Sequence, residues 1–549
     1  MPTIDIKEVD ISPLGTADVT TNAVYVPGYA LIGPVGVPTL CETLTQFREI
    51  FGSAPYIFKE NGNIDSTLEG VVGFNYSWKA GSPEPSYLYA SELLNLGLPV
   101  IYERVETGTE YTASTDDFSP VISAIEPGIA GELIYFTLTS STLEYPEGSD
   151  HVYYILSVGR DAGSGATQGV PAVSPVKTFF TFDSDLPAVD SKFKLVSIND
   201  TFTDNSGLVS VTVSDVTQET STKTNLVISG STSEEEFTPA DLYNYLNNNK
   251  LSRFEDRNDY VFKYITSGGY PSFGANGHLI ATNLLNVAVS RKDITALLDY
   301  EVGMDASATA PASIQTYLNT WFSSESYSGG EDVGNYAATF VPWGVHTIKT
   351  FGEREVEMVP SFSYLKALAN STQTYANWYA VAGVTRGFIP NIVSTSYNIS
   401  DTVGDNLQPT DAVAINPIQL IRPYGYRIWG SRTLRDNARN SDLRPDLVAT
   451  SFLNIRQLAN DVKRVVYLAG KQCQFEPDDS VLWINYKSAI TPLLDQMKGN
   501  RGLNAYEIKR VKSDKKATLK AVIKLYCIDP VENFDITLEL TDGEITVAE

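Results

Sequence analysis

The side chains that most often carry out catalysis are scarce in this sequence and form no known catalytic pattern. The 549 residues include three histidines, His151, His278 and His346. No two of them are spaced as metal ligands, and the sequence has neither a His-Glu-x-x-His motif nor a Gly-x-Ser-x-Gly nucleophile elbow. Carboxylates are plentiful, but no spacing singles out an acid–base pair. We therefore expect no catalytic residue, and we interpret each histidine as an ordinary surface or core residue.

Two polar segments and the cysteines also have simple structural interpretations. Residues 163–169 are rich in glycine, but they lack the lysine and the strand-to-helix context of a phosphate-binding loop, so we expect a flexible loop. Residues 478–480, Asp-Asp-Ser, are typical of a helix N-cap, where acidic charge is favoured by the helix dipole. The cysteines Cys41, Cys473 and Cys527 are far apart and odd in number, so we expect neither a disulfide framework nor a metal site.

The composition is that of a folded, acidic protein. Hydrophobic residues make up 42% of the chain and charged residues 19%, which is ordinary for a globular protein. A length of 549 residues suggests about three or four domains. The net charge of −26 would repel nucleic acid and anionic membranes, so we expect direct binding to neither. The sequence contains no run of about 18 apolar residues, so we expect no membrane insertion. The first residues do not resemble a secretory signal.

The positive charge is concentrated in one part of the chain. Residues 1–421 hold 20 basic and 49 acidic residues, whereas residues 422–524 hold 20 basic and 10 acidic residues. Residues 525–549 hold 7 acidic residues and no basic one. The basic stretch could bind nucleic acid, dock on an acidic protein or form a solvated surface, and the acidic remainder favours a protein partner. Its candidate contact residues are Arg501, Lys509, Arg510, Lys512, Lys515 and Lys516.

Both ends of the chain are predicted to be extended arms. Apolar and polar residues alternate over part of residues 1–20, and they alternate again in residues 531–549 around a turn at Asp542-Gly543. The first segment could instead be a frayed terminus, and the second could pair within its own domain. The apolar residues of the two arms are Ile4, Ile6, Val9, Ile11, Phe534, Ile536, Leu538, Leu540, Ile545 and Val547.

Two regions follow the first arm. Residues 21–105 are predicted to be a small α/β unit, with strands at 23–26, 29–34 and 99–105 and helices at 43–51, 64–78 and 84–96. Residues 106–235 carry short strand-like runs separated by turn-forming residues, which predicts an inserted all-β domain. Its expected strands lie at 133–138, 152–158, 177–182, 193–198, 208–213 and 225–228.

The remaining regions combine helices and strands. Residues 236–418 alternate between the two, which predicts a parallel or mixed sheet covered on both faces. The helices expected here are one opening at Thr238-Pro239 and others at 275–290, 311–323 and 361–374, with strands at 260–265, 294–299 and 336–341. Residues 419–530 are predicted to contain a strand at 419–429, long helices at 446–468 and 479–498, and a closing strand at 520–527. The fold class is therefore a mixed α+β multidomain protein with an α/β core.

Several of these segments resemble, in order, the contractile-tail sheath protein family. Residues 425–434, GYRIWGSRTL, are close to the family signature G-x-x-V-W-G-A-R-T-L, and residues 475–483 resemble its F-E-P-N-D…L-W pattern. Residues 338–343, ATFVPW, resemble its Y-x-P-W strand. Looser likenesses lie at 28–52, 99–105, 358–383 and 415–418. The resemblance covers about 20–105 and 240–530, and it leaves residues 106–235 and both chain ends unmatched.

The resemblance implies a structural protein without an active site or a cofactor. Members of this family resemble one another in a subtilisin-like α/β core that has no protease chemistry. This core is joined to a C-terminal domain, and the inner face of the assembly contacts a tube. Residues 236–418 and 419–530 would form these two parts, and the basic residues would contact the tube. Residues 1–12 and 533–547 would add strands to the sheet of a neighbouring copy. The partners would be other copies in a helical homopolymer, the inner tail tube protein, and baseplate and tail terminator proteins.

We therefore expect the sheath subunit of a contractile phage tail. It would assemble in the host cytoplasm, become part of the virion tail, and drive the tube through the host envelope for genome delivery. Subunits would slide and rotate as nearly rigid bodies. One alternative is the sheath of a phage-derived contractile injection particle of the tailocin type. Others are a subtilisin-like hydrolase, against which the few histidines argue, and a β-rich receptor-binding protein, which would form trimers.

Overall fold

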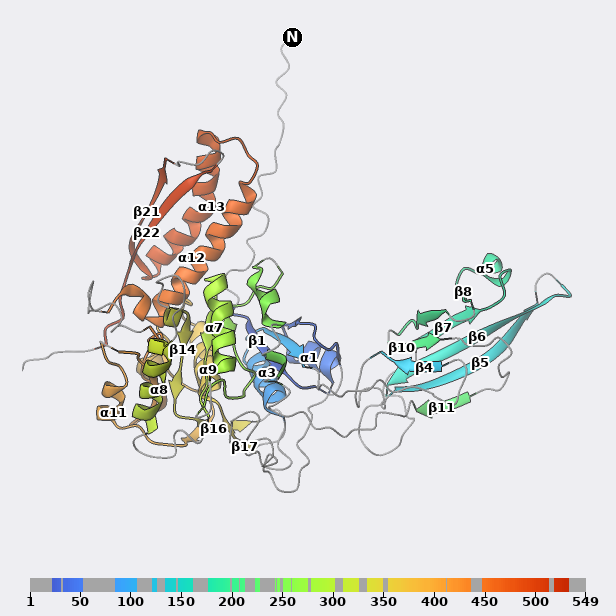
Figure 1. Ribbon diagram of the computed structural model, residues 1–549, viewed down its shortest axis with the longest axis horizontal. Coiled ribbons are helices and arrows are strands. Elements are labelled where there is room, and N and C mark those ends of the chain that lie inside the picture. Colours follow the sequence, from blue (N-terminus) through green and yellow to red (C-terminus); the bar gives the residue numbers. More distant parts are fainter. Residues whose placement is uncertain are drawn as a thin grey trace, which may run out of the picture.

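In the computed structural model of the protein, the described residues form three separate hydrophobic cores. We call the parts around them the core body (residues 22–105 and 242–435), the insertion (residues 121–227) and the C-terminal domain (residues 453–532). In Figure 1 the insertion lies to one side of the core body, and the C-terminal domain stands above it. The structure describes residues 22–30, 33–52, 84–105, 121–125, 134–144, 147–160, 176–197, 200–206, 208–212, 223–227, 242, 244–246, 250–257, 259–274, 278–301, 310–324, 333–348, 354–410, 412–435, 447–512 and 518–532.

A six-stranded sheet forms the centre of the core body, with the strand order β14-β13-β12-β1-β3-β2. The strands from β14 to β3 run parallel, and β2 is antiparallel to β3. All residues of β1 and β3 are buried, as expected for a parallel sheet covered on both faces. In chain order the parallel strands follow the pattern 2-1-3-4-5, a doubly wound arrangement. The bounds are β1 Val24–Gly28, β2 Thr39–Cys41, β3 Val100–Arg104, β12 Tyr264–Ile265, β13 Thr295–Leu297 and β14 Ala337–Ala338.

Helices α1, α3, α7, α8 and α9 of the core body lie close to their predicted ranges, whereas α10, α11 and the two short 3-10 helices were not predicted. Helix α3 packs along β1 and β3, α9 packs against α3, and α7 packs against β13. Helix α1 begins after Thr43, whose side chain accepts a hydrogen bond from the Gln46 N–H, and ends at Gly52 with a φ of 77°. The bounds are α1 Leu44–Phe51, α3 Pro85–Asn95, α7 Leu279–Arg291, α8 Ala310–Ser324, α9 Pro360–Thr372, α10 Gly383–Arg386, α11 Asp401–Asn406, η1 Lys250–Glu255 and η3 Val333–Tyr336.

Three strand predictions for the core body were wrong in detail. The stretch 419–429 is a hairpin of two strands, because the chain turns through Pro423 and Gly425, which has a φ of 84°. The stretch 336–341 divides between two sheets, as β14 and β15. The described residues among 29–34 form no strand. The two smaller sheets contain β15 Phe340–Val341, β19 Asn416–Ile421 and β20 Gly425–Ile428, and β17 Arg354–Met358, β16 Gly344–Ile348 and β18 Ile392–Thr395.

The described part of the insertion consists of two packed sheets and one short helix; all strand pairs in these sheets are antiparallel except β7 with β8, which is parallel. The sheet orders are β11-β5-β6-β7-β8 and β4-β10-β9, and the rings of Phe180 on β7 and Phe202 on β9 meet between them at 5.2 Å. Buried and half-buried residues alternate in β4 and β10, as in strands with one face on a core. The bounds are β4 Val121–Ala124, β5 Ile134–Glu144, β6 Asp150–Arg160, β7 Val176–Thr181, α5 Leu186–Val189, β8 Lys194–Leu195, β9 Thr201–Thr203, β10 Val209–Thr212 and β11 Lys223–Val227.

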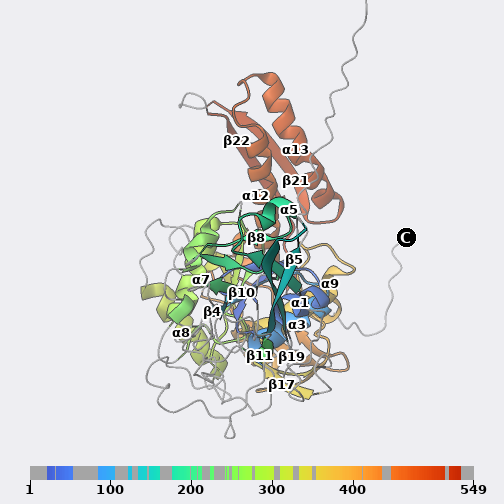
Figure 2. The ribbon, with the colours of Figure 1, turned by 90° about the vertical axis from the view of Figure 1, so that its right-hand side faces the viewer.

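The C-terminal domain is a pair of long helices packed against a two-stranded sheet (Figure 1). Figure 2 shows the same domain after a turn of 90° about the vertical axis. Its elements are α12 Leu453–Gln472, α13 Ser480–Gly499, β21 Leu503–Val511 and β22 Lys520–Cys527. Helix α12 starts later than the predicted residue 446, because residues 449–451 form the short helix η5 Ala449–Ser451 and Phe452 is extended, in a bridge with Arg432. Asp479 caps α13, as predicted, with its side chain accepting from the Leu482 N–H.

Several predictions lie outside the described residues. These are the helix at 64–78, the glycine-rich loop at 163–169 and the arm residues at 1–20 and 533–549. Among the helices that the structure does describe, none combines the length and the apolar character needed to span a membrane. The fold is a mixed α/β fold with several sheets, which agrees with the predicted class at that level. The subtilisin-like character of the core and the predicted domain boundaries remain predictions.

Candidate assembly site

The buried His346 contacts a serine hydroxyl but lacks the third member of a catalytic triad. Its Nε2 lies 2.9 Å from Ser363 Oγ, whereas its Nδ1 has no hydrogen-bond partner. A Ser-His-Asp site needs a carboxylate at that second nitrogen. Burial, followed by the positive charge of Lys366, lowers the pKa of His346 well below its ordinary value, so the ring is neutral at pH 7. Within the described residues, this pair therefore has the geometry of a core hydrogen bond.

The other two histidines have different surroundings and lie far from His346 in the chain. His151, in the insertion, pairs through Nδ1 with Asp183. His278 lies 3.2 Å from the Tyr317 hydroxyl and packs on the ring of Trp321, with centroids 4.8 Å apart. No cluster of three or more His, Cys, Asp or Glu suited to a metal ion occurs within the described ranges. The described residues thus bring no two histidines together around a shared ligand position.

Asp299 is a buried carboxyl group that caps helix α9. It follows β13, and its two oxygens accept hydrogen bonds from the Ser361 N–H, at 2.8 Å, and from the Ser361 hydroxyl, at 2.6 Å. The N-cap residue Val359 has no side-chain oxygen, so Asp299 supplies the missing acceptor from the neighbouring strand. Burial raises the pKa of Asp299 to about 7, although the hydrogen bonds from Ser361 oppose this rise. The group holds α9 against the sheet.

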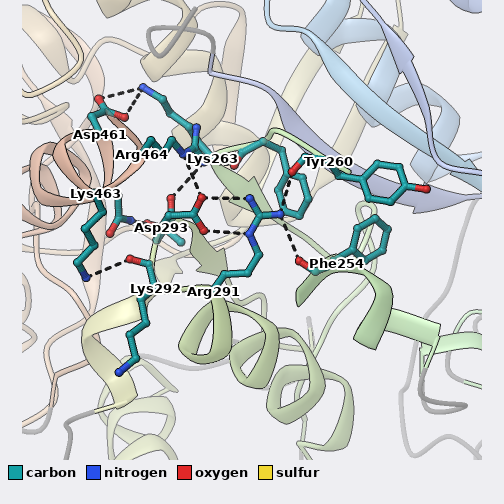
Figure 3. A network of polar contacts seen from close by, with 12 residues as sticks. Phe254, Tyr260, Lys263, Arg291, Lys292, Asp293, Asp461, Lys463 and Arg464 are labelled. Carbon is teal, nitrogen blue, oxygen red and sulfur yellow. Dashed lines mark hydrogen bonds and ion pairs between the residues drawn. The ribbon is translucent and has the colours of Figure 1, made fainter. Parts of the chain in front are cut away.

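The most extensive polar site joins α12 to the core body (Figure 3). Asp293, just before β13, receives two hydrogen bonds from Arg291, at 2.9 and 3.1 Å, and one from Arg464 of α12 at 3.3 Å. All three side chains are at most 7% exposed. Burial raises the pKa of Asp293, but the hydrogen bonds and charges of Arg291 and Arg464 outweigh it, and the net pKa lies below its ordinary value. The carboxylate is therefore ionised between two guanidinium groups.

A second ion pair lies one helical turn earlier on α12. Lys263, which precedes β12, lies 2.8 Å from the Asp461 carboxylate, and both side chains are 7% exposed. Arg464 also donates to the Phe262 carbonyl, and Lys463 donates to the Lys292 carbonyl at 3.0 Å. We call these contacts the α12 junction. Because they connect α12 to the amino ends of two central strands through buried bonds, they fix the direction in which the C-terminal domain projects.

The sequence analysis missed the α12 junction, although a signal was present. Gln457, Asn460, Asp461 and Arg464 follow the spacing of one helix face and alternate there with Leu458 and Val462. Polar residues on the apolar face of a helix require partners in the body on which it packs. The identity of those partners could not be predicted, because Asp293 lies 171 positions away from Arg464.

The sheet of β21 and β22 has one covered face and two open edges. The strands are nine and eight residues long, and each pairs with no other described strand. Exposure alternates along β22: Ile523 and Leu525 pack on the third hydrophobic core, whereas Val522 and Tyr526 are 36% and 51% exposed. A two-stranded sheet is the smallest sheet that can form, and its unpaired edges can accept further strands.

The structure divides the predicted basic residues between different places. Arg510 lies on the covered side of the sheet and binds Asp478 and the Asp479 carbonyl at the start of α13. Lys509 lies on the exposed side beside Glu507, opposite Val522 of β22. Arg501 precedes β21, at the other end of that strand, with a φ of 59°. Lys512 follows β21 and is exposed, and Lys515 and Lys516 lie outside the described residues.

The basic residues that do share the exposed face with Lys509 are Lys520 and Lys524. They alternate with apolar residues on β22, and Lys524 stands opposite Glu507. The outer face of this sheet is therefore mixed: the three lysines share it with Glu507 and with the exposed residues Val511, Val522 and Tyr526. The predicted arm residues, Ile4 to Ile11 and Phe534 to Val547, all lie outside the described residues.

Comparison with solved structures gives several proteins of similar fold. The sheath tail protein Lin1278 from Listeria innocua matches with a TM-score of 0.55 at 11% identity, over 92% of this chain and 95% of that chain. The helical sheath of the anti-feeding prophage (AFP), in the contracted state, matches with a TM-score of 0.46 at 14% identity, over 99% of both chains. A sheath tail protein from Desulfitobacterium hafniense matches with a TM-score of 0.45 at 10% identity, over 96% of this chain and 100% of that chain. No protein-family model matches the sequence, and no curated protein matches it significantly.

Proposed function

We propose that this chain, which has the fold of the sheath tail protein Lin1278, is a structural subunit of a contractile tail sheath. The observation that carries the proposal is the extent of the fold match, which spans 92% of this chain and 95% of the Listeria protein. The subunit polymerises as a helix around an inner tube and contracts to drive the tube through an envelope. It belongs to a tail particle that is assembled in the host cytoplasm and delivers a genome, and it uses no enzymatic chemistry.

Subunits join through the open edges of β21 and β22. Within the described residues, each edge offers eight or nine residues of backbone that pair with no further strand, and one face of the sheet is already packed on α12 and α13. We assign residues 1–12 and 533–547 of neighbouring copies as the strands that pair there, because their apolar and polar residues alternate. A contact of this head-to-tail kind does not close on itself, and it therefore generates an open helical polymer.

Contraction moves the core body and the C-terminal domain together. The buried α12 junction supports this, because bending between the two parts would separate Arg464 from Asp293 and Asp461 from Lys263 in a dry environment. The change of lattice then takes place at the arms between subunits. The driving free energy is the difference in packed interface between the extended and the contracted lattice, held back by a kinetic barrier. No nucleotide is required for this step.

The partner on the inside of the sheath is the tube protein. The outer face of the β21–β22 sheet offers Lys520 and Lys524 to an acidic partner surface. Of the predicted set, Arg510 and Lys509 are already paired within the domain, with Asp478 and Glu507. The baseplate and tail terminator proteins contact the two ends of the polymer.

Deletion of either arm tests the proposal. Chains lacking residues 1–12 or residues 533–549 are expected to fold with unchanged far-ultraviolet circular dichroism and to remain monomeric, because the donor strands are gone while the core body is complete. The full chain is expected to form sleeves, seen by negative-stain microscopy and sedimentation. Sleeves of normal length from either truncated chain would contradict the assignment of the arms. A full chain that stays monomeric at high concentration would overturn the proposed function itself.

A further inference from the structure

Residues 430–434 form a rigid segment of backbone at the base of the C-terminal domain. The Asn416 side chain accepts from the Arg432 N–H at 2.7 Å and donates to the Arg432 carbonyl at 2.8 Å, so it holds both backbone groups of that residue. The Gln408 side chain packs closely on the backbone of Gly430, where a Cβ atom would lie 1.9 Å from Gln408 Nε2. The Leu434 N–H continues the segment by donating to the Ala337 carbonyl of β14 at 2.9 Å.

The side chain of Arg432 connects the two points at which the C-terminal domain joins the core body. We call this place the neck. The guanidinium group lies over the ring of Phe452, at 4.8 Å, one residue before α12 begins. Its Nε and Nη2 bind the carboxylate of Glu532, with Nε at 2.8 Å from Oε1. Glu532 lies five residues after the end of β22 and directly before the C-terminal arm. One residue thus contacts both the entry and the exit of the domain.

We infer that Arg432 and Glu532 are positioning residues that fix the point from which the C-terminal arm leaves the subunit, so that the arm is presented to a second copy of this chain. The inference rests on the proposed function and deepens it. Without the pair, residues 528–532 would lengthen the tether of the arm. A longer, freer tether lowers the effective concentration of the arm at the edge of a neighbouring sheet.

The geometry explains why these two residue types are needed. The Arg432 side chain is 3% exposed and that of Glu532 is 25% exposed, so the pair lies at the boundary between interior and solvent. A planar guanidinium can bind both carboxylate oxygens while it stacks on an aromatic ring, whereas a lysine would offer a single point charge. The pair therefore restrains the direction of the Glu532 side chain as well as its distance from the neck.

Full-length variants test this inference. Glu532→Gln keeps the length of the side chain and removes its charge. Glu476→Gln, an exposed position at the far end of the same domain, is the matched control for charge. Val462→Ala, in the packed part of α12, is the control for lost stability. The measurement is the chain concentration at which half of the protein sediments as polymer, at a temperature where circular dichroism finds every variant folded.

We expect Glu532→Gln to raise this concentration about tenfold, by loss of effective concentration. Both controls should stay within about twofold of the unmodified chain, because neither changes the tether of the arm. If the pair had a purely structural role, the concentration needed for assembly would instead depend on thermal stability alone. Val462→Ala and Glu532→Gln would then assemble equally well whenever their melting temperatures are equal. That result, or normal assembly of Glu532→Gln, would overturn the inference while leaving the proposed function intact.

The pair itself is tested by a double-mutant cycle. Arg432→Gln and Glu532→Gln should impair assembly to a similar extent, and the double variant should be no worse than the worse single variant, because each removes the same contact. Arg432→Lys should recover only part of the assembly. Additive losses would mean that the two residues act independently. If the unmodified chain forms no polymer, the proposed function fails before the pair is examined.

Discussion

The buried carboxyl group of Asp299 caps helix α9, although burial makes its ionised form unfavourable. It lies within the core body with 1% of its surface exposed, and its partners are the N–H and hydroxyl groups of Ser361. Burial opposes ionisation and raises the pKa of Asp299 to about 7, well above the usual value for an aspartate. The folded protein therefore holds this proton more tightly than the unfolded chain does. Its protonated form contributes stability that is fully present below about pH 4 and is lost as the pH rises through about 7.

The variant Asp299→Asn isolates this effect. An amide keeps an oxygen for the Ser361 N–H, but it cannot ionise. We expect the free energy of unfolding of the original protein, minus that of the variant, to fall by about 2–4 kcal/mol between pH 4 and pH 8. The measurement is urea unfolding at several pH values, below the concentration of assembly. Asp405→Asn, at an exposed position on α11, serves as the control. A difference that does not change with pH would refute the assignment.

Neither Asp299 nor Asp293, the partner of α12 in the core body, could be recognised from the sequence as buried. A carboxylate is normally exposed, and whether it is buried depends on residues that are distant in the chain. Ser361 lies 62 positions from Asp299, and Arg464 lies 171 positions from Asp293. The absence of catalytic spacing among the histidines, in contrast, was a local property of the sequence. The described histidines indeed lie in three different environments.

At the scale of elements, α12 is held by polar contacts as well as by its apolar face. Asp461→Asn removes the negative charge that faces Lys263 in a site where both side chains are 7% exposed. We expect a loss of about 3–5 kcal/mol in the free energy of unfolding, because a positive charge then lies in the interior without its carboxylate. The double variant Lys263→Met and Asp461→Leu should recover most of that loss, because it replaces the ion pair with apolar contacts.

The control for this prediction is an ion pair on the surface. Glu507→Gln disrupts the contact between Glu507 and Lys509 on the outer face of β21 and should leave thermal unfolding unchanged within error, because water screens such pairs. Equal effects of Asp461→Asn and Glu507→Gln would mean that the α12 junction contributes no more than a surface pair. In that case the junction would not account for a rigid connection between α12 and the core body.

The sequence predicted long helices more reliably than short strands. Helices α12 and α13 are 20 residues each and carry several turns of periodic apolar residues. Strands such as β13 and β15 have three and two residues, too few to establish a period, and their assignment to a sheet depends on partners elsewhere in the chain. The stretch predicted as one strand at 419–429 is divided into β19 and β20, because Pro423 and Gly425 form the turn between them.

At the scale of the whole molecule, the uneven charge was predictable, but its arrangement was not. The count of basic residues in 422–524 is a property of composition, whereas the face on which each side chain lies depends on the register of β21 and β22. A shift of one residue would exchange Lys509 and Arg510 between the outer and the covered face. The buried α12 junction uses a further part of the same positive charge, at Arg464.

The insertion has the properties of an independent folding unit. Its hydrophobic core is separate from that of the core body, and it contains Phe136, Leu156, Phe180 and Val211, all at most 1% exposed. Its two sheets pair strands only from within residues 121–227. Strand β3, which precedes it, is part of the parallel sheet whether or not the insertion is present, because its partners are β1 and β2. A chain without the insertion thus keeps every described strand pair of the core body.

Replacement of residues 106–235 by a short Gly/Ser linker should therefore give a folded protein. We expect its melting temperature to lie within about 4 °C of that of the full chain, since a change of about 1 kcal/mol shifts a large domain by only 2–4 °C. Under the proposed function it should also form sleeves of normal length, because β21, β22, the neck and both arms are retained. Residues 106–235 expressed alone should unfold in one cooperative transition. Loss of assembly in a chain that circular dichroism finds folded would instead mean that the insertion contributes contacts between subunits, and its outer strands would then have to be counted among the assembly surfaces.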